Sequence, residues 1–189
     1  MRRTKLEYEL ELDIDACYKM ESIYNESKEN FESVEKWLYL GADLRDGGYA
    51  KLGLTMGDLS SRSYSSANPY YYIFCAFKCH CEMDGRKLAS IERDALRYLD
   101  GVFVNPDGST KRVPHTESGR MSECFYNIDF VEFFVVLHEY LYGNYRNCFL
   151  PCGFENEAGY YEGEFLDCEF NKRMSLFEIN ECIRKILQF

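Results

Sequence analysis

Hydrophobic and acidic residues alternate strictly near the start of the chain. From Leu6 to Ile14, every second residue is Leu, Tyr or Ile, and Glu or Asp fills the positions between them. Because successive side chains of a strand point to opposite faces, this period of two predicts a half-buried strand with one acidic face. The polar stretch over residues 21–36 is expected to be a helix or a loop that leads into the middle of the chain.

Two short apolar runs in the next segment predict a hairpin. Residues 37–40 form an apolar run that ends at Gly41, and residues 49–55 resume the strand pattern after the turn at Gly47-Gly48. Runs of this length, parted by a loop that contains glycine, are typical of paired antiparallel strands.

Turn signals and periodicity then predict a helix, a strand and a second helix. A short helix is expected over residues 58–66, because Asp58 is a suitable N-cap and Pro69 follows the segment. The aromatic-rich residues 70–79 predict a third strand. Residues 87–99 place apolar side chains three and four positions apart, which is typical of a helix with one buried face.

A long loop is expected over residues 100–121, where Gly, Pro and Asp recur. Loops of this length inside a small domain are often functional. Residues 123–127 predict one more short strand, and Asp129 with Glu132 forms the capping pattern of a helix start.

The C-terminal segment is expected to be irregular before it ends in a helix. Residues 143–170 are rich in Gly, Glu and aromatic residues. Ser175 and Glu178 form a capping-box pattern, which opens a final helix. This helix is expected to bury four residues on its apolar face: Ile179, Cys182, Ile183 and Ile186.

These elements predict an α+β fold with a small, mostly antiparallel central sheet of three to four strands flanked by helices. An N-terminal strand extension and a C-terminal helical extension are expected at its two ends. The predicted organisation is an acidic N-terminal extension over residues 1–36, a core domain over 37–142, and a C-terminal extension over 143–189.

Composition narrows the class of protein. With 46% hydrophobic and 16% aromatic residues, the chain has enough apolar side chains for a packed core, so disorder is a poor interpretation. No run of 18 apolar residues predicts a membrane span, and the start lacks the apolar middle of a signal peptide. We therefore expect an intracellular protein that is not secreted and has no membrane partner, and its nine cysteines are expected to be thiols.

Charge is distributed unevenly along the chain. The net charge is −10, but residues 37–127 hold equal numbers of basic and acidic side chains, so the flanks carry the whole excess. A neutral middle is compatible with a local positive groove for nucleic acid. The acidic flanks either cover such a groove or form a solvated face, and the second interpretation is favoured.

Residues 37–130 resemble the GIY-YIG nuclease family, over about half of the chain. The second motif, Lys-Leu-Gly-Leu-Thr, is similar to the Lys-Ile-Gly-Ile-Thr form common in phages and large DNA viruses. The matching segments, in the family's order, are Trp37-Leu38-Tyr39, Lys51-Leu52-Gly53-Leu54-Thr55, Asp58-Leu59-Ser60-Ser61-Arg62, Asn68-Pro69-Tyr70, Ile91-Glu92-Arg93-Asp94-Ala95-Leu96 and Ser122-Glu123-Cys124-Phe125-Tyr126.

The resemblance implies a site for hydrolysis of a nucleic-acid phosphodiester. Glu92 would hold Mg²⁺ or Mn²⁺, because hard divalent ions prefer carboxylate oxygens. Arg62 would bind phosphate oxygens with its forked guanidinium. Tyr39 would accept a proton from the attacking water if nearby cations lower its pKa, and Lys51 would supply such a cation.

Five further residues are candidates for the site or for contacts with its substrate. Tyr49 lies two positions before Lys51 and shares its strand face, and Asn127 corresponds to a polar residue that supports the site in some members. The basic side chains of the predicted loop, Lys111, Arg112 and Arg120, are either nucleic-acid backbone contacts or solubilising charges.

The chain departs from the family pattern in its first motif. Trp37 and Leu38 stand where Gly-Ile is usual, Lys51 replaces the second tyrosine, and no histidine closely follows Arg62. Taken singly, Tyr39 is more often a core residue, Glu92 a solvent-edge residue and Arg62 a surface residue. Their joint order favours the functional interpretation.

Cysteines and one histidine also suggest a metal site. Cys75, Cys79, His80 and Cys81 lie close in sequence, but the paired spacing of zinc sites is absent, so buried thiols are favoured. Cys148, Cys152 and Cys168 form a weaker second candidate without an evident fourth ligand.

Three functions remain open on this evidence. The first is a divalent-metal-dependent endonuclease of a phage or large DNA virus, acting on DNA or RNA in the host cytoplasm or nucleus. The second is a catalytically inactive relative that serves as an interaction or virion component, with virion proteins or a second copy as partners. The third is a protein whose acidic flanks mimic nucleic acid and block a DNA-binding partner.

Overall fold

The computed structural model describes residues 32–57, 59, 68–156 and 158–188. They belong to the second of two units into which the chain divides, Glu32–Phe189. The predicted strand over residues 6–14 lies outside the described residues, as does all but one residue of the predicted helix over 58–66. The elements are, in order, β1 (Glu32–Asp43), β2 (Ala50–Thr55), β3 (Tyr71–His80), α3 (Gly85–Val102), β4 (Arg112–Pro114), β5 (Met121–Phe125), α4 (Phe130–Tyr145), the 3-10 turn η1 (Arg146–Cys148), β6 (Pro151–Glu155), β7 (Tyr161–Leu166), β8 (Cys168–Phe170) and α5 (Leu176–Leu187).

The main sheet has six strands in the order β4-β5-β2-β1-β3-β8. Every pairing in it is antiparallel, and the expected β1–β2 hairpin pairs Trp37 with Thr55 and Gly41 with Lys51. The α+β class and the mostly antiparallel sheet are therefore confirmed. The expected count of three to four strands was too low, because β4 and β8 also join the sheet.

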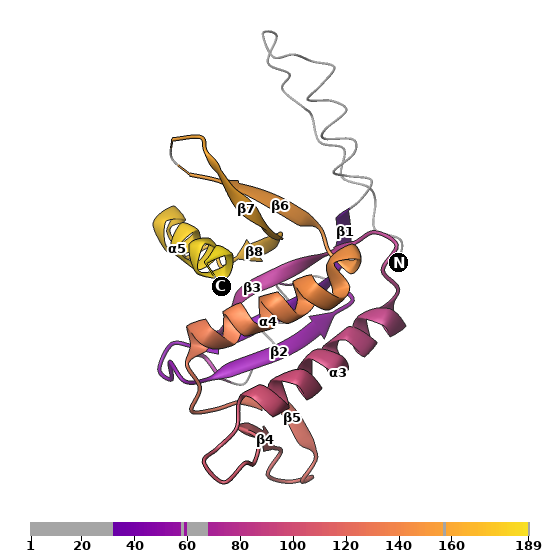
Figure 1. Ribbon diagram of the computed structural model, residues 1–189. Helices are drawn as coiled ribbons and strands as arrows, with labels where there is room; N and C mark the ends of the chain where they lie inside the picture. Colours follow the sequence, from indigo (N-terminus) through magenta and orange to yellow (C-terminus); the bar gives the residue numbers. More distant parts are fainter. Residues whose placement is uncertain (1–31, 58, 60–67, 157, 189) are drawn as a thin grey trace. The chain divides into compact units, whose positions relative to one another are not determined.

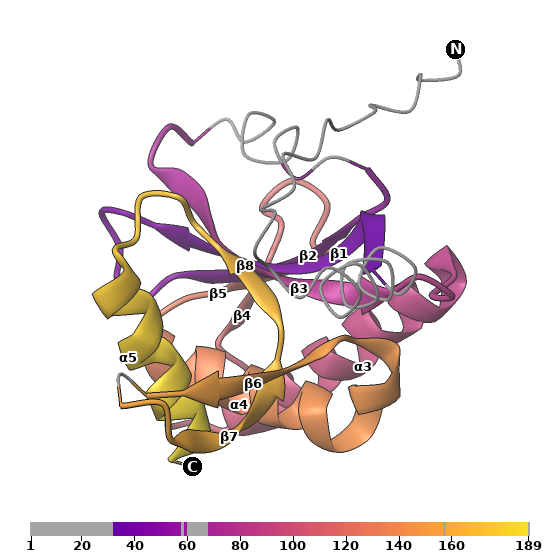
Figure 2. The same ribbon diagram turned by 90° about the horizontal axis from the view of Figure 1, so that it is seen from above.

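Helices α3 and α4 lie side by side over one face of this sheet (Figures 1 and 2). Alternate residues of β1 and β2, such as Leu38 and Leu52, point toward the helices and are completely buried. Helix α4 begins at its predicted cap, Asp129, whereas α3 begins at Gly85, two residues before its predicted start at Lys87. The Asp84 side chain accepts from the Lys87 N–H, and that of Asp129 accepts from two N–H groups of the first turn.

The C-terminal segment is more regular than its sequence suggests. Residues 143–170 were expected to be irregular, but they contain the β6–β7 hairpin and the sheet strand β8. Helix α5 packs against β7 and α4, and it begins with the predicted capping box of Ser175 and Glu178.

Two other segments differ from expectation. Residues 32–36 belong to β1 and are neither helix nor loop, because β1 extends before the apolar run at 37–40. The long loop over 100–121 contains β4, which forms a hairpin with β5. Among the described residues, no helix is both long enough and apolar enough to cross a membrane.

Candidate functional site

Glu92 lies at the middle of α3, on the side of the helix that meets the edge of β2. Burial, and after it the neighbouring carboxylate of Glu123, raise the pKa of the Glu92 carboxyl to about 7. A hydrogen bond from the Leu54 backbone N–H and the positive charge of Lys51 oppose this rise. Two carboxylates, one cation and one backbone donor therefore meet at this point of the fold.

The strand register explains why these groups meet. β5 pairs with β2 at Ala50 and Lys51, so Leu54 lies beyond the paired stretch of β2. Its N–H is available to the Glu92 carboxylate for that reason. Glu123 follows the alternation of β5 and shares the helix-facing side with Phe125, which is fully buried in the core beneath the helices. We name Glu92 and Glu123 the carboxylate pair.

Tyr39 approaches the same part of β2 from the opposite face of the sheet. It pairs with Gly53, and its ring covers that glycine so closely that a Cβ there would lie 2.6 Å from the ring. The side chain is only 5% exposed and packs with Ile73 and Ala76. Tyr39 and Glu92 thus contact adjacent residues of β2, Gly53 and Leu54, but from different sides.

Tyr49 shares the face of Lys51 but is held by other aromatic residues. Its hydroxyl lies 3.3 Å from the Cys124 Sγ, and its ring meets the Tyr126 ring edge-on at 5.1 Å. Burial raises the pKa of Tyr49 far above its ordinary value. This environment favours a neutral hydroxyl that stabilises the sheet and disfavours a proton acceptor.

The Lys51 ammonium lies 5.9 Å from the centre of the Tyr71 ring. Burial raises the pKa of Tyr71, and the Tyr39 hydroxyl raises it further. Lys51 therefore lies on the tyrosine-lined face of β2, and its positive charge also acts on Glu92.

The other predicted site residues are more scattered. Arg62 lies outside the described residues. Asn127 has a positive φ of 56°, and its backbone carbonyl accepts from the Lys111 ammonium at 2.7 Å. Arg112 forms an ion pair with Asp100 at 2.8 Å and is 16% exposed.

Arg120 is exposed in the turn between β4 and β5. Of the three predicted nucleic-acid contacts, it therefore has the most accessible side chain, whereas Lys111 and Arg112 make bonds within the fold. Their assignment to nucleic acid stays a prediction.

The cysteines of the first candidate metal cluster differ in their burial. Cys75 and Cys79 are buried in β3, whereas Cys81 is exposed just after the strand ends. Burial raises the pKa of Cys75, and it raises that of Cys79 to about 12. In the part of the chain that the structure describes, no three His, Cys, Asp or Glu side chains are grouped so as to hold a metal ion.

Glu123 is the site residue that sequence analysis missed. It stands inside a segment matched to the family, Ser122-Glu123-Cys124, yet no role was assigned to it. The available signal was the alternation of that strand, which places Glu123 on the same side as the core residue Phe125. An acidic residue on a core-facing side needs a partner or a function.

The candidate site is formed by residues that the fold brings together. The carboxylate pair, Lys51 and the Leu54 N–H come from three elements, α3, β2 and β5, that are far apart in sequence. No protein-family model, no curated protein and no solved structure matches the chain.

Proposed function

We propose that this protein is a divalent-metal-dependent endonuclease of the GIY-YIG type, which hydrolyses phosphodiester bonds in DNA. The observation that carries the proposal is the carboxylate pair with Lys51 beside it. Two adjacent, partly desolvated carboxylates repel each other when both are ionised. A divalent cation bound between them would relieve that repulsion.

The donor set fits magnesium or manganese. Glu92 and Glu123 would hold the ion through carboxylate oxygens, the ligands that these hard cations prefer. The bound ion would polarise a phosphate oxygen and an attached water. Lys51 places a further positive charge next to the pair, where it would attract a phosphate group. That same charge weakens the site for a cation alone, so the ion and the phosphate are expected to bind best together.

Tyr39 reaches β2 from the face of the sheet opposite the carboxylate pair, so its role in the proposal comes from the resemblance alone. Its ring lies on Gly53, next to the residue whose N–H binds Glu92. Tyr39 would accept the proton of the attacking water, and Arg62 would bind phosphate oxygens. Both roles derive from the resemblance.

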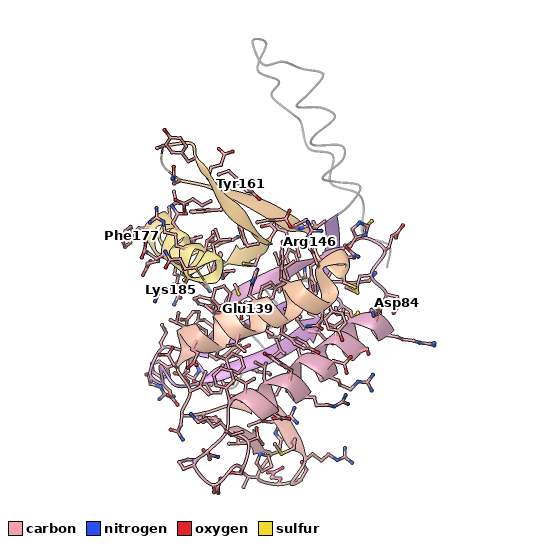
Figure 3. All side chains as sticks on the ribbon, viewed as in Figure 1. Asp84, Glu139, Arg146, Tyr161, Phe177 and Lys185 are labelled. Carbon is pink, nitrogen blue, oxygen red and sulfur yellow. The ribbon has the colours of Figure 1, made fainter. Side chains whose placement is uncertain are left out.

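The test is plasmid cleavage by the full chain with Mg²⁺ or Mn²⁺. We expect nicked or linear products, no cleavage in EDTA, and a loss of roughly 100-fold or more for Glu92→Gln, the size typical of losing one key electrostatic group. Glu139→Gln is the matched control, because Glu139 is an exposed glutamate on α4 and its loss changes the net charge equally (Figure 3). Equal activity of the two variants would remove Glu92 from the proposed site.

A second candidate function is a non-catalytic interaction or virion component with the same fold. The burial of Tyr39 favours it, because a tyrosine that is only 5% exposed must become more accessible before its hydroxyl can meet a substrate. Wild-type protein that fails to cut plasmid, single-stranded DNA and RNA with either metal would favour this candidate over the first.

A further inference from the structure

Three arginines form a line along the outer side of α3, and we name them the arginine stripe: Arg86, Arg93 and Arg97. At 3.6 residues per turn, their separations of seven and four positions place them within an arc of about 40°. The stripe runs for about 16 Å along the helix. The buried residues of α3, among them Leu88 and Ala95, lie on the opposite side.

The side chains of the arginine stripe form fewer ion pairs with the described residues than other arginines of the chain do. Arg86 and Arg93 are exposed and have no ion-pair partner among the residues that the structure describes. Arg97 is 79% exposed and makes a single long contact, at 3.4 Å, with Asp94. By contrast, the arginines that form close ion pairs are Arg112 with Asp100, Arg146 with Glu164 and Arg184 with Glu181.

The nearest acidic side chains on α3 do little to cancel the stripe. The Asp94 carboxylate accepts from the Tyr145 hydroxyl at 3.0 Å and also from Ser90. Asp100 is occupied by Arg112 and by the Thr110 hydroxyl. In Figure 3, nitrogen-tipped side chains project from α3 on the side away from α4.

We infer that the arginine stripe binds the sugar–phosphate backbone of a nucleic acid. The inference rests on the proposed function, for which it names the surface that holds the substrate. Guanidinium groups recognise phosphate oxygens through two parallel hydrogen bonds, which single ammonium groups do not offer. Arg93 directly follows Glu92 in α3, but at about 100° per residue the two side chains point to different sides of the helix, so the stripe lies on a surface beside the carboxylate pair and not over it.

The arginine stripe is a basic surface on a protein whose net charge is strongly negative. A chain with a net charge of −10 repels a polyanion at long range, and its solubility does not require a line of three arginines. Binding must then be local and strongly weakened by salt, because each neutralised phosphate releases counterions.

The test measures binding of the full chain to a fluorescent 20-base-pair DNA duplex in EDTA, where cleavage is blocked. Arg86→Gln/Arg93→Gln/Arg97→Gln is compared with Lys172→Gln/Arg173→Gln/Lys185→Gln, which removes the same charge from exposed positions in and before α5 (Figure 3). We expect the stripe variant to bind at least about tenfold more weakly, with a salt slope lower by about 2 to 3. The control variant should stay within about twofold of the wild type.

Several outcomes would overturn the inference. Equal weakening by the two variants would show that only net charge matters, and wild-type protein without affinity for DNA or an RNA duplex would leave the stripe without this partner. Poly-glutamate that competes as well as DNA at equal charge would show a general anion surface. Because binding in EDTA is independent of cleavage, a stripe that binds DNA in an inactive protein would keep this inference and reject the proposed endonuclease.

Discussion

Glu92 is less favourably ionised in the folded chain than in the unfolded one. Burial, and then Glu123, raise the pKa of its carboxyl from the ordinary value of 4.5 to about 7. Between these values the folded state binds the proton more tightly than the unfolded state. Its contribution to stability is therefore fully present below about pH 4.5 and is lost as the pH rises through about 7.

The substitution Glu92→Gln should therefore stabilise the protein at alkaline pH in the absence of metal. We expect its melting temperature at about pH 8 to exceed that of the wild type by roughly 2–4 °C, the shift that about 1 kcal/mol produces in a domain of this size. At about pH 4.5 the difference should be much smaller. Thermal unfolding followed by circular dichroism measures both, with Glu139→Gln as the control that changes little at either pH. A pH-independent effect of Glu92→Gln would contradict the buried carboxylate pair.

Some residues of the candidate site can be predicted from the sequence, and others cannot. The sequence predicts Glu92 as a site residue, because the resemblance places a glutamate at that position of a helix. Neither Glu123 as its neighbour nor Asp100 as the ion-pair partner of Arg112 could be predicted, because both contacts join elements through the fold. The presence of a basic residue in the sequence does not show whether its side chain forms an ion pair within the fold.

At the scale of elements, the β1–β2 hairpin depends on a close contact between Tyr39 and Gly53. The two residues are paired across the strands, and the tyrosine ring occupies the space that a Cβ at Gly53 would need. The motif glycine is thus explained by packing, whether or not the hairpin serves catalysis.

The substitution Gly53→Ala should destabilise the protein by roughly 1–3 kcal/mol, as overpacking of a tight site does. Gly47→Ala is the matched control, because no atom lies within 4 Å of the added methyl group and the expected change is near zero. Urea unfolding measures both. In the background of Tyr39→Leu, the penalty of Gly53→Ala should shrink, since the two side chains compete for one space. Additive effects would show that the ring does not fill this space.

The elements that sequence patterns missed share a physical reason. β4 and β8 have three residues each, too few to show a period of two. Longer segments with a clear alternation or helical spacing, such as 70–79 and 87–99, appear as predicted in β3 and α3. Short strands are formed by their long-range pairing, which no local pattern reveals.

At the scale of the whole described fold, the C-terminal segment completes the sheet and its helical layer. β8 pairs with β3 at the edge, and the β6–β7 hairpin is joined to α4 through His138. The His138 side chain is 3% exposed, and its Nε2 accepts from the Leu166 backbone N–H at 2.9 Å. The neutral ring must then carry its proton on Nδ1, which is buried without a hydrogen-bond partner among the described residues.

This histidine should make the fold sensitive to acid. Burial lowers the pKa of His138 from its ordinary 6.5 to about 4, so the folded protein keeps the ring neutral while the unfolded chain takes up a proton below about pH 6.5. Stability from this group is complete above that pH and is lost as the pH falls toward 4. The gap between the two values, at about 1.4 kcal/mol for each pH unit, corresponds to roughly 3 kcal/mol in full and roughly 2 kcal/mol by about pH 5.

His138→Gln separates this effect from the titration of carboxylates, because an amide oxygen can still accept from Leu166 but takes up no proton. We expect the free energy of unfolding of the wild type to fall by roughly 2 kcal/mol more than that of the variant between about pH 7.5 and pH 5. His115→Gln, at an exposed turn position, should follow the wild type. Parallel pH profiles for wild type and His138→Gln would mean that the ring is solvated or already charged, and that the C-terminal hairpin is not held to α4 through a neutral histidine.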